Sequence, residues 1–274
     1  EITTYLEKAL ASELSGNVID LCPVGALTSK PYAFVSRPWE LKKTETIDVM
    51  DAIGSNIRVD ARGGEVLRVL PRVNEDINEE WISDKTRFSC DGLKRQRLDK
   101  PYVRRDGKLV STTWDEALEV VANKMKKVKP DAIAALAGDQ CDAESMFALK
   151  CLMTKLGVEN IDCRQDGAKI DADSRTGYVF NSTIAGIEEA DAILLVGTNP
   201  RWEAPVLNAR IRKRWLETGL PIGLIGEEYD LTYDVNFIGN RATFLEEILE
   251  DDHSFAKILD NANRPMLILG MNAL

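Results

Sequence analysis

Short apolar runs of strand length recur through the second half of this 274-residue chain, and the first two are each followed by a segment of helical periodicity. Strands that alternate with amphipathic helices in this way predict a parallel, doubly wound sheet. The apolar runs are residues 132–138, 192–197, 221–226 and 266–271, and the helical segments are about 142–156 and 204–218. We therefore expect an α/β, Rossmann-like domain over 101–274, truncated at its C-terminus because the last strand ends the chain.

The part before this domain is predicted to be rich in β structure. Two β-rich runs flank Gly63-Gly64 within residues 44–72, which predicts a hairpin. A second hairpin is expected at 102–110, where Asp106-Gly107 supplies the turn, and Thr113 is expected to cap the next helix. The remaining expectations are a helix at 1–14, a linker at 29–43 and a charged surface wrap at 74–100.

Composition excludes several classes of function. The formal net charge is −10, which argues against nucleic acid or an anionic membrane as the main partner. No apolar stretch is long enough to span a bilayer. The single histidine, His253, nearly excludes a His-based metal site or a Ser–His triad, and we expect it only near a helix end. The cysteines are few, odd in number and widely spaced, which suits a reducing compartment: Cys22, Cys90, Cys141, Cys151 and Cys163.

Cys22 is the most specific candidate site residue, since it is followed at once by Pro23. A Cys-Pro pair commonly closes a four-cysteine iron–sulfur site, but the three other cysteines do not precede it here. A lone buried thiol is the plainer interpretation. We favour a chain that belongs to a longer iron–sulfur protein, because it starts at Glu1 and the residues around Cys22 are distinctive.

Other candidates carry weaker signals. Gly197-Thr198-Asn199-Pro200 follows a strand and precedes a helix, where α/β sheets bind ligands and phosphates. It lacks the GxGxxG pattern, so a structural turn is favoured. Residues 181–186 are a ligand loop or a capped turn. We expect no ligand at the acidic pairs Glu188-Glu189 and Asp171/Asp173, only thiols at Cys141, Cys151 and Cys163, and a solvated or interface face at Arg210, Arg212, Lys213 and Arg214.

Residues 21–32 and 37–40 resemble the large iron–sulfur subunit of respiratory complex I, in its bacterial and mitochondrial forms, and the resemblance continues through most of the chain. It implies that Cys22 is the fourth ligand of a [4Fe–4S] cluster whose other ligands lie upstream of these 274 residues. Backbone N–H groups of residues 22–26 would then bond to the sulfur. The resemblance implies a cluster in the full-length protein and none in these residues alone.

The rest of the chain resembles the first part of the molybdopterin oxidoreductase fold. Where cluster-bearing members have four cysteines, this sequence has oxygen side chains, which suit iron–sulfur cores poorly. We expect this domain to keep the fold without the cluster, with Cys90 outside the ligand register. The positions that have lost their ligands are Asp48, Asp51, Ser55 and Ser83. Residues 197–200 echo a pterin-contacting stretch, so Gly197, Thr198, Asn199 and Pro200 are expected to form a vestigial pocket.

The resemblance implies a subunit that relays electrons from NADH and flavin toward quinone, with this part mainly a scaffold. Expected partners are other hydrophilic-arm subunits of complex I, without nucleic acid or membrane insertion. The expected location is peripheral, at the cytoplasmic side of a bacterial inner membrane or the matrix side of the mitochondrial one. Two alternatives stay open, a molybdenum or tungsten bis-pterin oxidoreductase such as a formate dehydrogenase and a purely structural module. The expected domains are a ferredoxin-like tail and linker (1–40), a small β-rich domain (41–100) and the α/β domain (101–274).

Overall fold

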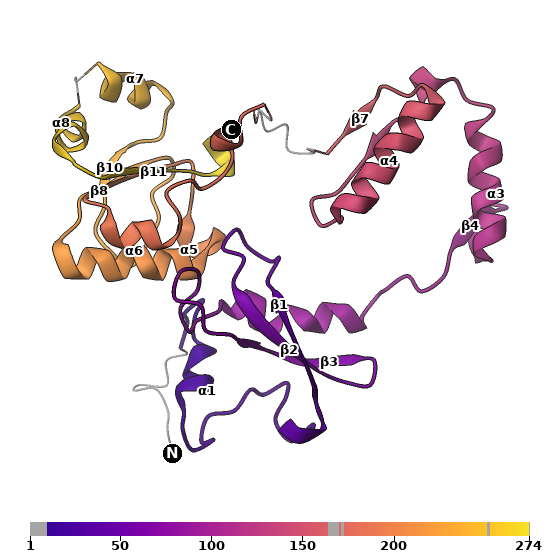
Figure 1. The fold of residues 1–274 in the computed structure, drawn as a ribbon, viewed down its shortest axis with the longest axis horizontal. Helices are drawn as coiled ribbons and strands as arrows, with labels where there is room; N and C mark the ends of the chain where they lie inside the picture. Colours follow the sequence, from indigo (N-terminus) through magenta and orange to yellow (C-terminus); the bar gives the residue numbers. More distant parts are fainter. Residues whose placement is uncertain (1–9, 164–169, 171–172, 251–252, 274) are drawn as a thin grey trace. The chain divides into compact units, whose positions relative to one another are not determined.

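The computed structural model describes residues 10–163, 170, 173–250 and 253–273. The chain divides into two compact units, residues 1–94 with 170–274 and residues 95–169 (Figure 1). In the first unit, α1 (Asn17–Leu21) begins where we expected a helix to stop. Residues 10–14, the described end of the predicted helix, are not helical, and a turn over 13–16 leads into α1. Asp84 fixes this turn by accepting from the Ser15 hydroxyl and the Gly16 N–H. Most of the helix predicted at 1–14 lies outside the described residues.

The small β-rich domain is a three-stranded antiparallel sheet in the order β1-β2-β3. Its strands are β1 (Lys42–Ile47), β2 (Asn56–Arg62) and β3 (Glu65–Pro71), and the short helix η2 (Pro38–Glu40) precedes them. The hairpin at Gly63-Gly64 is confirmed, with Arg62 paired to Glu65. Successive side chains of β2 and β3 point to opposite faces of the sheet, and one face carries Ile57 and Val69. These two side chains pack against Ile82 and form the apolar core of this domain.

The charged segment after β3 is not a surface wrap, and that prediction was wrong. It contains α2 (Asp84–Phe88) and η3 (Ser89–Lys94), and it buries Asn78, Ile82, Thr86 and Arg87. Polar side chains can be buried here because their partners are supplied locally. The Asn78 amide, for example, donates to the Arg72 and Trp81 carbonyls.

The α/β part of the first unit is a parallel four-stranded sheet in the order β10-β9-β8-β11 (Figure 1). The predicted α/β fold class is therefore confirmed. Strand order reverses between β8 and β11, which makes their carboxyl ends a switch point where α/β folds bind ligands. The strands are β8 (Ala192–Val196), β9 (Ile222–Ile225), β10 (Asn236–Gly239) and β11 (Pro265–Leu269).

Helices cover both faces of this sheet, as the doubly wound prediction requires (Figure 1). Alternate residues of β8 enter different cores: Ile193 and Leu195 pack with Ile211 of α6, whereas Leu194 packs with Phe255 of α8. His253 caps α8, with its Nδ1 accepting from the Phe255 N–H at 3.1 Å. The helices of this part are η5 (Arg175–Gly177), η6 (Ala185–Glu189), α5 (Pro200–Glu203), α6 (Pro205–Thr218), α7 (Thr243–Leu249), α8 (Ser254–Asn261) and η7 (Met271–Ala273).

A buried arginine joins the small β domain to the parallel sheet. Arg210 of α6 is only 4% exposed, and its guanidinium lies 3.5 Å from Glu79 and 3.3 Å from Glu188. It also donates to the Glu75 carbonyl at 2.5 Å. Lys213, which is exposed, bridges the same two carboxylates at 3.0 and 3.2 Å. The basic run of α6 was predicted to form either a solvated face or an interface. Arg210 lies in an interface, the one between α6 and the small β domain.

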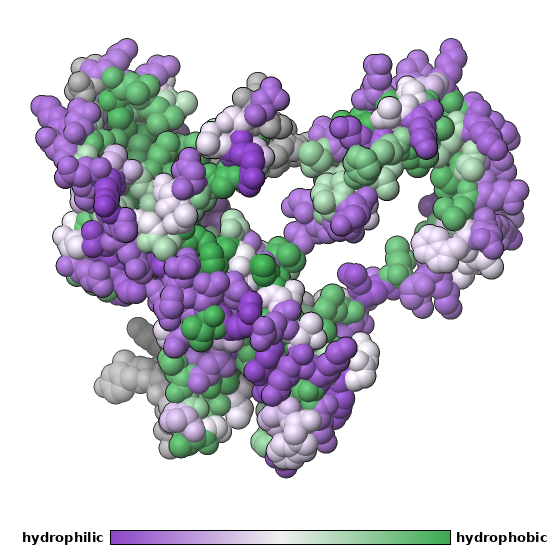
Figure 2. Space-filling view, in the orientation of Figure 1, coloured by the Kyte–Doolittle hydropathy of each residue, from purple (hydrophilic) through white to green (hydrophobic). Residues whose placement is uncertain are grey.

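The unit at 95–169 has the predicted hairpin, helices and capping by Thr113, but the buried strand predicted at 132–138 is wrong. Only two residues are in a strand, and Leu136 is exposed because the sheet β6–β7 has just two short strands. Leu118 and Phe147 are among its exposed apolar side chains. Figure 2 shows green patches among purple on this unit. Its elements are β4 (Tyr102–Arg105), β5 (Lys108–Ser111), α3 (Trp114–Met125), η4 (Pro130–Ala132), β6 (Ala135–Leu136), α4 (Ala143–Leu156) and β7 (Ile161–Asp162).

Candidate functional site

The segment that carries Cys22 is anchored to α2 by buried polar contacts. Asn17 accepts from the Ile82 N–H and from Arg87, and it donates to the Ile82 carbonyl at 2.8 Å. Arg87, 4% exposed, also pairs with Asp20 at 2.6 Å. Because Asp20 lies two residues before Cys22, these contacts set the position at which α1 ends and the Cys22 turn begins.

The Cys22 thiol lies in a turn of backbone N–H groups. Cys22 ends α1, and Gly25 has a φ of 67°, which lets the chain curl back around the sulfur. Hydrogen bonds from the N–H groups of Leu27, Val24, Ala26 and Gly25 lower the pKa of the thiol. This direction of the shift favours a thiolate, which is the form that binds metals.

Cys22 should react faster with iodoacetamide than Cys90 near neutral pH. The thiolate is the nucleophile, and while N–H groups lower the pKa of Cys22, burial raises that of Cys90. The midpoint of the pH–rate profile should therefore lie lower for Cys22. Pulsed alkylation across pH, with each cysteine followed by peptide mass spectrometry, measures both. In urea the two pH–rate profiles should coincide, because the folded structure that separates the two pKa values is lost. A midpoint for Cys22 at or above that of Cys90 in the folded chain would contradict the lowered pKa of Cys22.

The positions predicted to have lost their cluster ligands come together in a polar cluster of the small domain, mostly buried. Thr86 Oγ1 donates to Asp48 Oδ2 at 2.8 Å and lies 2.8 Å from Ser83 Oγ. Ser83 is also the N-cap of α2 and accepts from the Thr86 N–H at 3.1 Å. The Asp51 carboxyl lies beside Ser83, and Asp48 donates its N–H to the Ser55 carbonyl at 2.8 Å. Sequence reasoning missed Thr86, although the spacing Ser83-x-x-Thr86 before a helix is a capping signal.

Two oxygens of this cluster have no hydrogen-bond donor within the described part of the chain. They are Asp51 Oδ2 and Ser55 Oγ, both buried. The Thr86 hydroxyl donates to Asp48, and Asp51 has the Ser83 hydroxyl and the charge of Lys85 as neighbours. Burial raises the pKa of Asp51, and the Asp48 charge raises it further. The cluster is thus polar and acidic, with Lys85 as a cation beside it.

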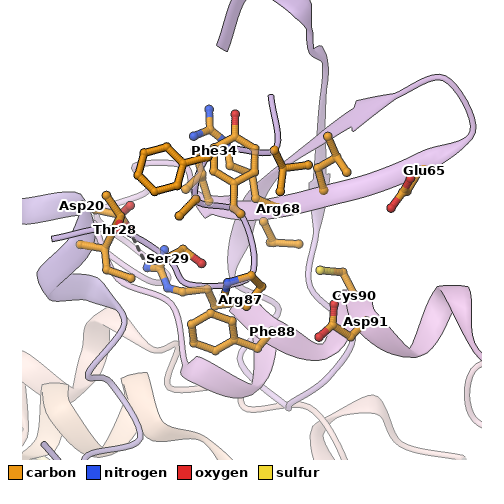
Figure 3. A pocket seen from close by; sticks show the side chains of 18 of the residues that line it. Asp20, Thr28, Ser29, Phe34, Glu65, Arg68, Arg87, Phe88, Cys90 and Asp91 are labelled. Atoms are coloured by element: carbon orange, nitrogen blue, oxygen red, sulfur yellow. Dashed lines mark hydrogen bonds and ion pairs between the residues drawn. The ribbon is translucent and has the colours of Figure 1, made fainter. Parts of the chain in front are cut away.

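A separate cavity, which sequence reasoning did not find, lies beside the Cys22 segment. It has a volume of about 440 Å³ and lies between residues 27–35, β3 and the α2–η3 segment. Figure 3 shows the Arg87–Asp20 pair and the Cys90 side chain in its wall. Its charged lining is mixed in sign and singles out no class of ligand: Asp20, Glu65, Arg68, Arg87, Asp91 and Lys94.

The predicted pocket at Gly197–Pro200 lies at the switch point of the parallel sheet, after β8. Thr198 and Asn199 are buried, and the chain's own Glu203 accepts from the Thr198 hydroxyl and from the Asn199 N–H, each at 2.9 Å. A phosphate would need these same donors, and the Glu203 carboxylate would repel it. Asn199 Oδ1 is buried without a partner among the described residues.

The backbone also fills the end of β8. The Gly270 N–H donates to the Val196 carbonyl at 2.9 Å, and the Asn272 N–H donates to the Gly197 carbonyl at 3.3 Å. A Cβ on Gly197 would lie 2.6 Å from the Ala273 nitrogen, so only glycine fits between β8 and η7. The donors and the space of this turn do not fit a pterin diphosphate.

Family comparisons divide the chain into three stretches. Residues 97–274 match the family described as "Molybdopterin oxidoreductase". Residues 41–91 match "NADH-ubiquinone oxidoreductase NDSU1/NuoG-like, 4Fe-4S domain", and residues 1–28 match "NADH-quinone oxidoreductase subunit 3, ferredoxin-like domain". A solved structure, acetylene hydratase from Pelobacter acetylenicus, is similar with a TM-score of 0.51 over 69% of this chain and 28% of its own, at 14% identity, which shows the fold alone.

Curated relatives match almost the whole chain. An NADH-quinone oxidoreductase subunit of Rickettsia bellii is 55% identical over 270 residues, which are 98% of this chain and 40% of the relative. The mitochondrial NADH-ubiquinone oxidoreductase 78 kDa subunit of Candida albicans is 57% identical over 98% of this chain and 38% of its own. The chain thus spans about two fifths of their length. It belongs to the molybdopterin oxidoreductase family, and its predicted kinship with the large iron–sulfur subunit of complex I is confirmed.

Proposed function

We propose that this chain is part of a subunit that relays electrons from NADH toward quinone through iron–sulfur clusters, and that it supplies one cluster ligand, Cys22. The observation that carries the proposal is the turn of backbone N–H groups around the Cys22 thiol, which favours a thiolate. The rest of the described chain acts as a scaffold that fixes this turn, chiefly through Asn17, Arg87 and α2.

One thiolate is one corner of a four-iron site, so the described residues do not fit a complete cluster. Nowhere in the described part of the chain do three or more His, Cys, Asp or Glu side chains gather as they would around a metal ion. We therefore propose that the other ligands lie outside these 274 residues and that the chain alone carries no cluster. The thiolate of Cys22 would fix one iron, and the N–H groups around it would tune that site.

The proposed partners are the other hydrophilic-arm subunits of the complex, including those that bind NADH and flavin. Among the described helices, none has the length and apolar character that crossing a membrane requires. We propose, from the similarity to complex I subunits, peripheral attachment at the cytoplasmic face of a bacterial inner membrane or the matrix face of the mitochondrial one. We do not propose a molybdenum or tungsten enzyme, because Glu203 takes the donors of the Gly197–Pro200 turn and η7 packs against Gly197.

Replacing Cys22 in the full-length protein tests this role. Cys22→Ser should remove one [4Fe–4S] cluster, seen as a loss of about four irons per protein and of one electron paramagnetic resonance signal. Cys90→Ser is the matched control, and it should leave iron and spectrum unchanged. If Cys22→Ser retains the iron and the spectrum of the parent protein, Cys22 is not a ligand and the proposed role of this residue is wrong.

A further inference from the structure

Residues 32–36 form a loop that two arginines hold to the small sheet. The Arg68 guanidinium of β3 lies 4.4 Å from the centroid of the Tyr32 ring, which is a cation–π contact. Arg62 of β2 donates to the Val35 carbonyl at 3.4 Å. The Tyr32 hydroxyl closes the loop by donating to its last carbonyl at 3.0 Å. These contacts give the loop a defined conformation on the sheet.

Phe34, in the middle of this loop, has a strained backbone and a fully exposed side chain. Its φ is 64°, in the left-handed region, where a bulky residue is an outlier. Because the ring is fully exposed, it adds nothing to the core of the described chain. Strain of this kind persists where surrounding contacts impose it, and it gathers at binding sites. Aromatic side chains are enriched in the cores of protein interfaces. The loop thus presents an aromatic side chain suited to contact another polypeptide segment.

Phe34 also lines the cavity of about 440 Å³ beside the Cys22 segment, and the basic side chains of this cavity are already paired. Figure 3 shows Phe34 on one side of the cavity and Phe88 on the other. Leu27 and Leu70 add to its apolar lining. Each of its three basic side chains has an acidic partner, in the pairs Arg87–Asp20, Lys94–Glu65 and Arg68–Asp60. What remains for a contact is the apolar lining, which fits apolar side chains of a protein segment.

This surface is continuous with the Cys22 turn. Ile19 lines the cavity just before the turn, and Leu27 lines it at the end of the turn. Leu21 and Val24, on either side of Cys22, are exposed apolar side chains. A four-iron cluster needs three further thiolates beside that of Cys22. The polypeptide that carries them must approach the turn, and it meets this apolar surface next to it.

We propose that Phe34 and the cavity form a docking surface for the segment of the full-length protein that carries the other three ligands of the Cys22 cluster. Phe34 anchors that segment by packing among its apolar side chains, and the cavity takes up an apolar side chain in return. Leu21 and Val24 extend the contact to the cluster. The proposal rests on the proposed role of Cys22, since the need for three more thiolates identifies the occupant.

Photochemical cross-linking in the full-length protein tests the docking surface. Phe34→p-benzoylphenylalanine places a photoreactive ketone at a fully exposed position, which tolerates the larger side chain. Irradiation should join residue 34 to the segment that carries the other three ligands, as identified by peptide mass spectrometry. The same substitution at Leu249, an exposed apolar residue of α7, is the control and should not capture that segment. Capture by residue 34 of another subunit, of a second copy or of no peptide would overturn the proposal.

Retention of the cluster gives a second measurement. Phe34→Ser in the full-length protein should release iron to a chelator at least about tenfold faster than the parent, as expected when an interface anchor is lost. Phe34→Tyr keeps the ring and should release iron at the parent rate. Neither change should alter the melting temperature of the 274-residue chain, in which Phe34 is fully exposed. Release from the Phe34→Ser protein at the parent rate would count against the docking surface.

The outcome for Cys22→Ser separates this proposal from the one on which it rests. If that variant loses its iron while residue 34 captures no part of the ligand-bearing segment, the docking surface is wrong and the role of Cys22 stands. If Cys22→Ser keeps its iron, the role of Cys22 itself is wrong.

Discussion

Replacing Asp48, Asp51, Ser55 and Ser83 together by cysteine should give a chain that takes up a [4Fe–4S] cluster on anaerobic reconstitution. These side chains already belong to one polar cluster, and β1, β2 and α2 hold their backbone in place. Four thiolates supply the donors that a four-iron cluster needs. The change also removes the two unsatisfied oxygens, while loss of the Ser83 cap costs about 1 kcal/mol. Iron and acid-labile sulfide per chain measure the outcome, together with visible absorption.

The matched control for this rebuilt site keeps Ser83 and introduces the other three cysteines. Its iron content should be lower and its cluster less stable, because one iron lacks a thiolate. The unchanged chain should bind none by this procedure. A four-cysteine variant that unfolds cooperatively yet takes up no iron would show that the assignment of these positions is wrong.

Replacing Arg210 by methionine should lower the free energy of unfolding by about 3–5 kcal/mol, the usual cost of leaving buried charges without their partner. The guanidinium is the buried cation between Glu79 and Glu188, and it satisfies the Glu75 carbonyl. Methionine replaces its volume but none of these contacts. Urea denaturation followed by circular dichroism measures the difference.

Lys213→Met is the control, since Lys213 contacts the same carboxylates from an exposed position and should cost about 0–1 kcal/mol. Although burial raises the pKa of Glu79, Lys213 and Arg210 hold it below its ordinary value of 4.5. The stability that Glu79 gains from them is therefore present above pH 4.5 and is lost as pH falls through the lower folded-state pKa. An Arg210 variant no less stable than the Lys213 variant would contradict the bridging role.

Those strands of the parallel sheet that consist of apolar residues throughout were predictable from the sequence. β8 and β9 are buried on both faces, so their residues form uninterrupted apolar runs. β10 was missed because its four residues include Asn236 and Gly239 and lie at an edge of the sheet. The run at 132–138 has the same local pattern as β8, yet it forms only a short exposed strand. Hydrophobic periodicity is a local signal. It does not show whether neighbouring strands pair with an apolar run and bury it.

The same limit applies to the site residues. The turn around Cys22 was predictable because its Cys-Pro sequence and its N–H donors lie within six residues. The link between Asp48 and Thr86 spans 38 residues, so it depends on tertiary structure that a single sequence does not display. Likewise, nothing local to Arg210 distinguishes it from its exposed neighbour Lys213, and only the fold brings Glu79 to it.

Helix α2 lies between the Cys22 turn and the polar cluster of Asp48, Asp51, Ser55 and Ser83. Its Ser83 and Thr86 side chains face Asp48, while its Arg87 holds Asp20 and Asn17. One short helix and its cap therefore fix two sites of different chemistry, one built on sulfur and one on oxygen. A substitution that moves α2 away from Asp48 therefore also moves Arg87, which holds Asp20 beside the Cys22 turn. Because both sites depend on α2, the effects of substitutions in the two sites should not be additive.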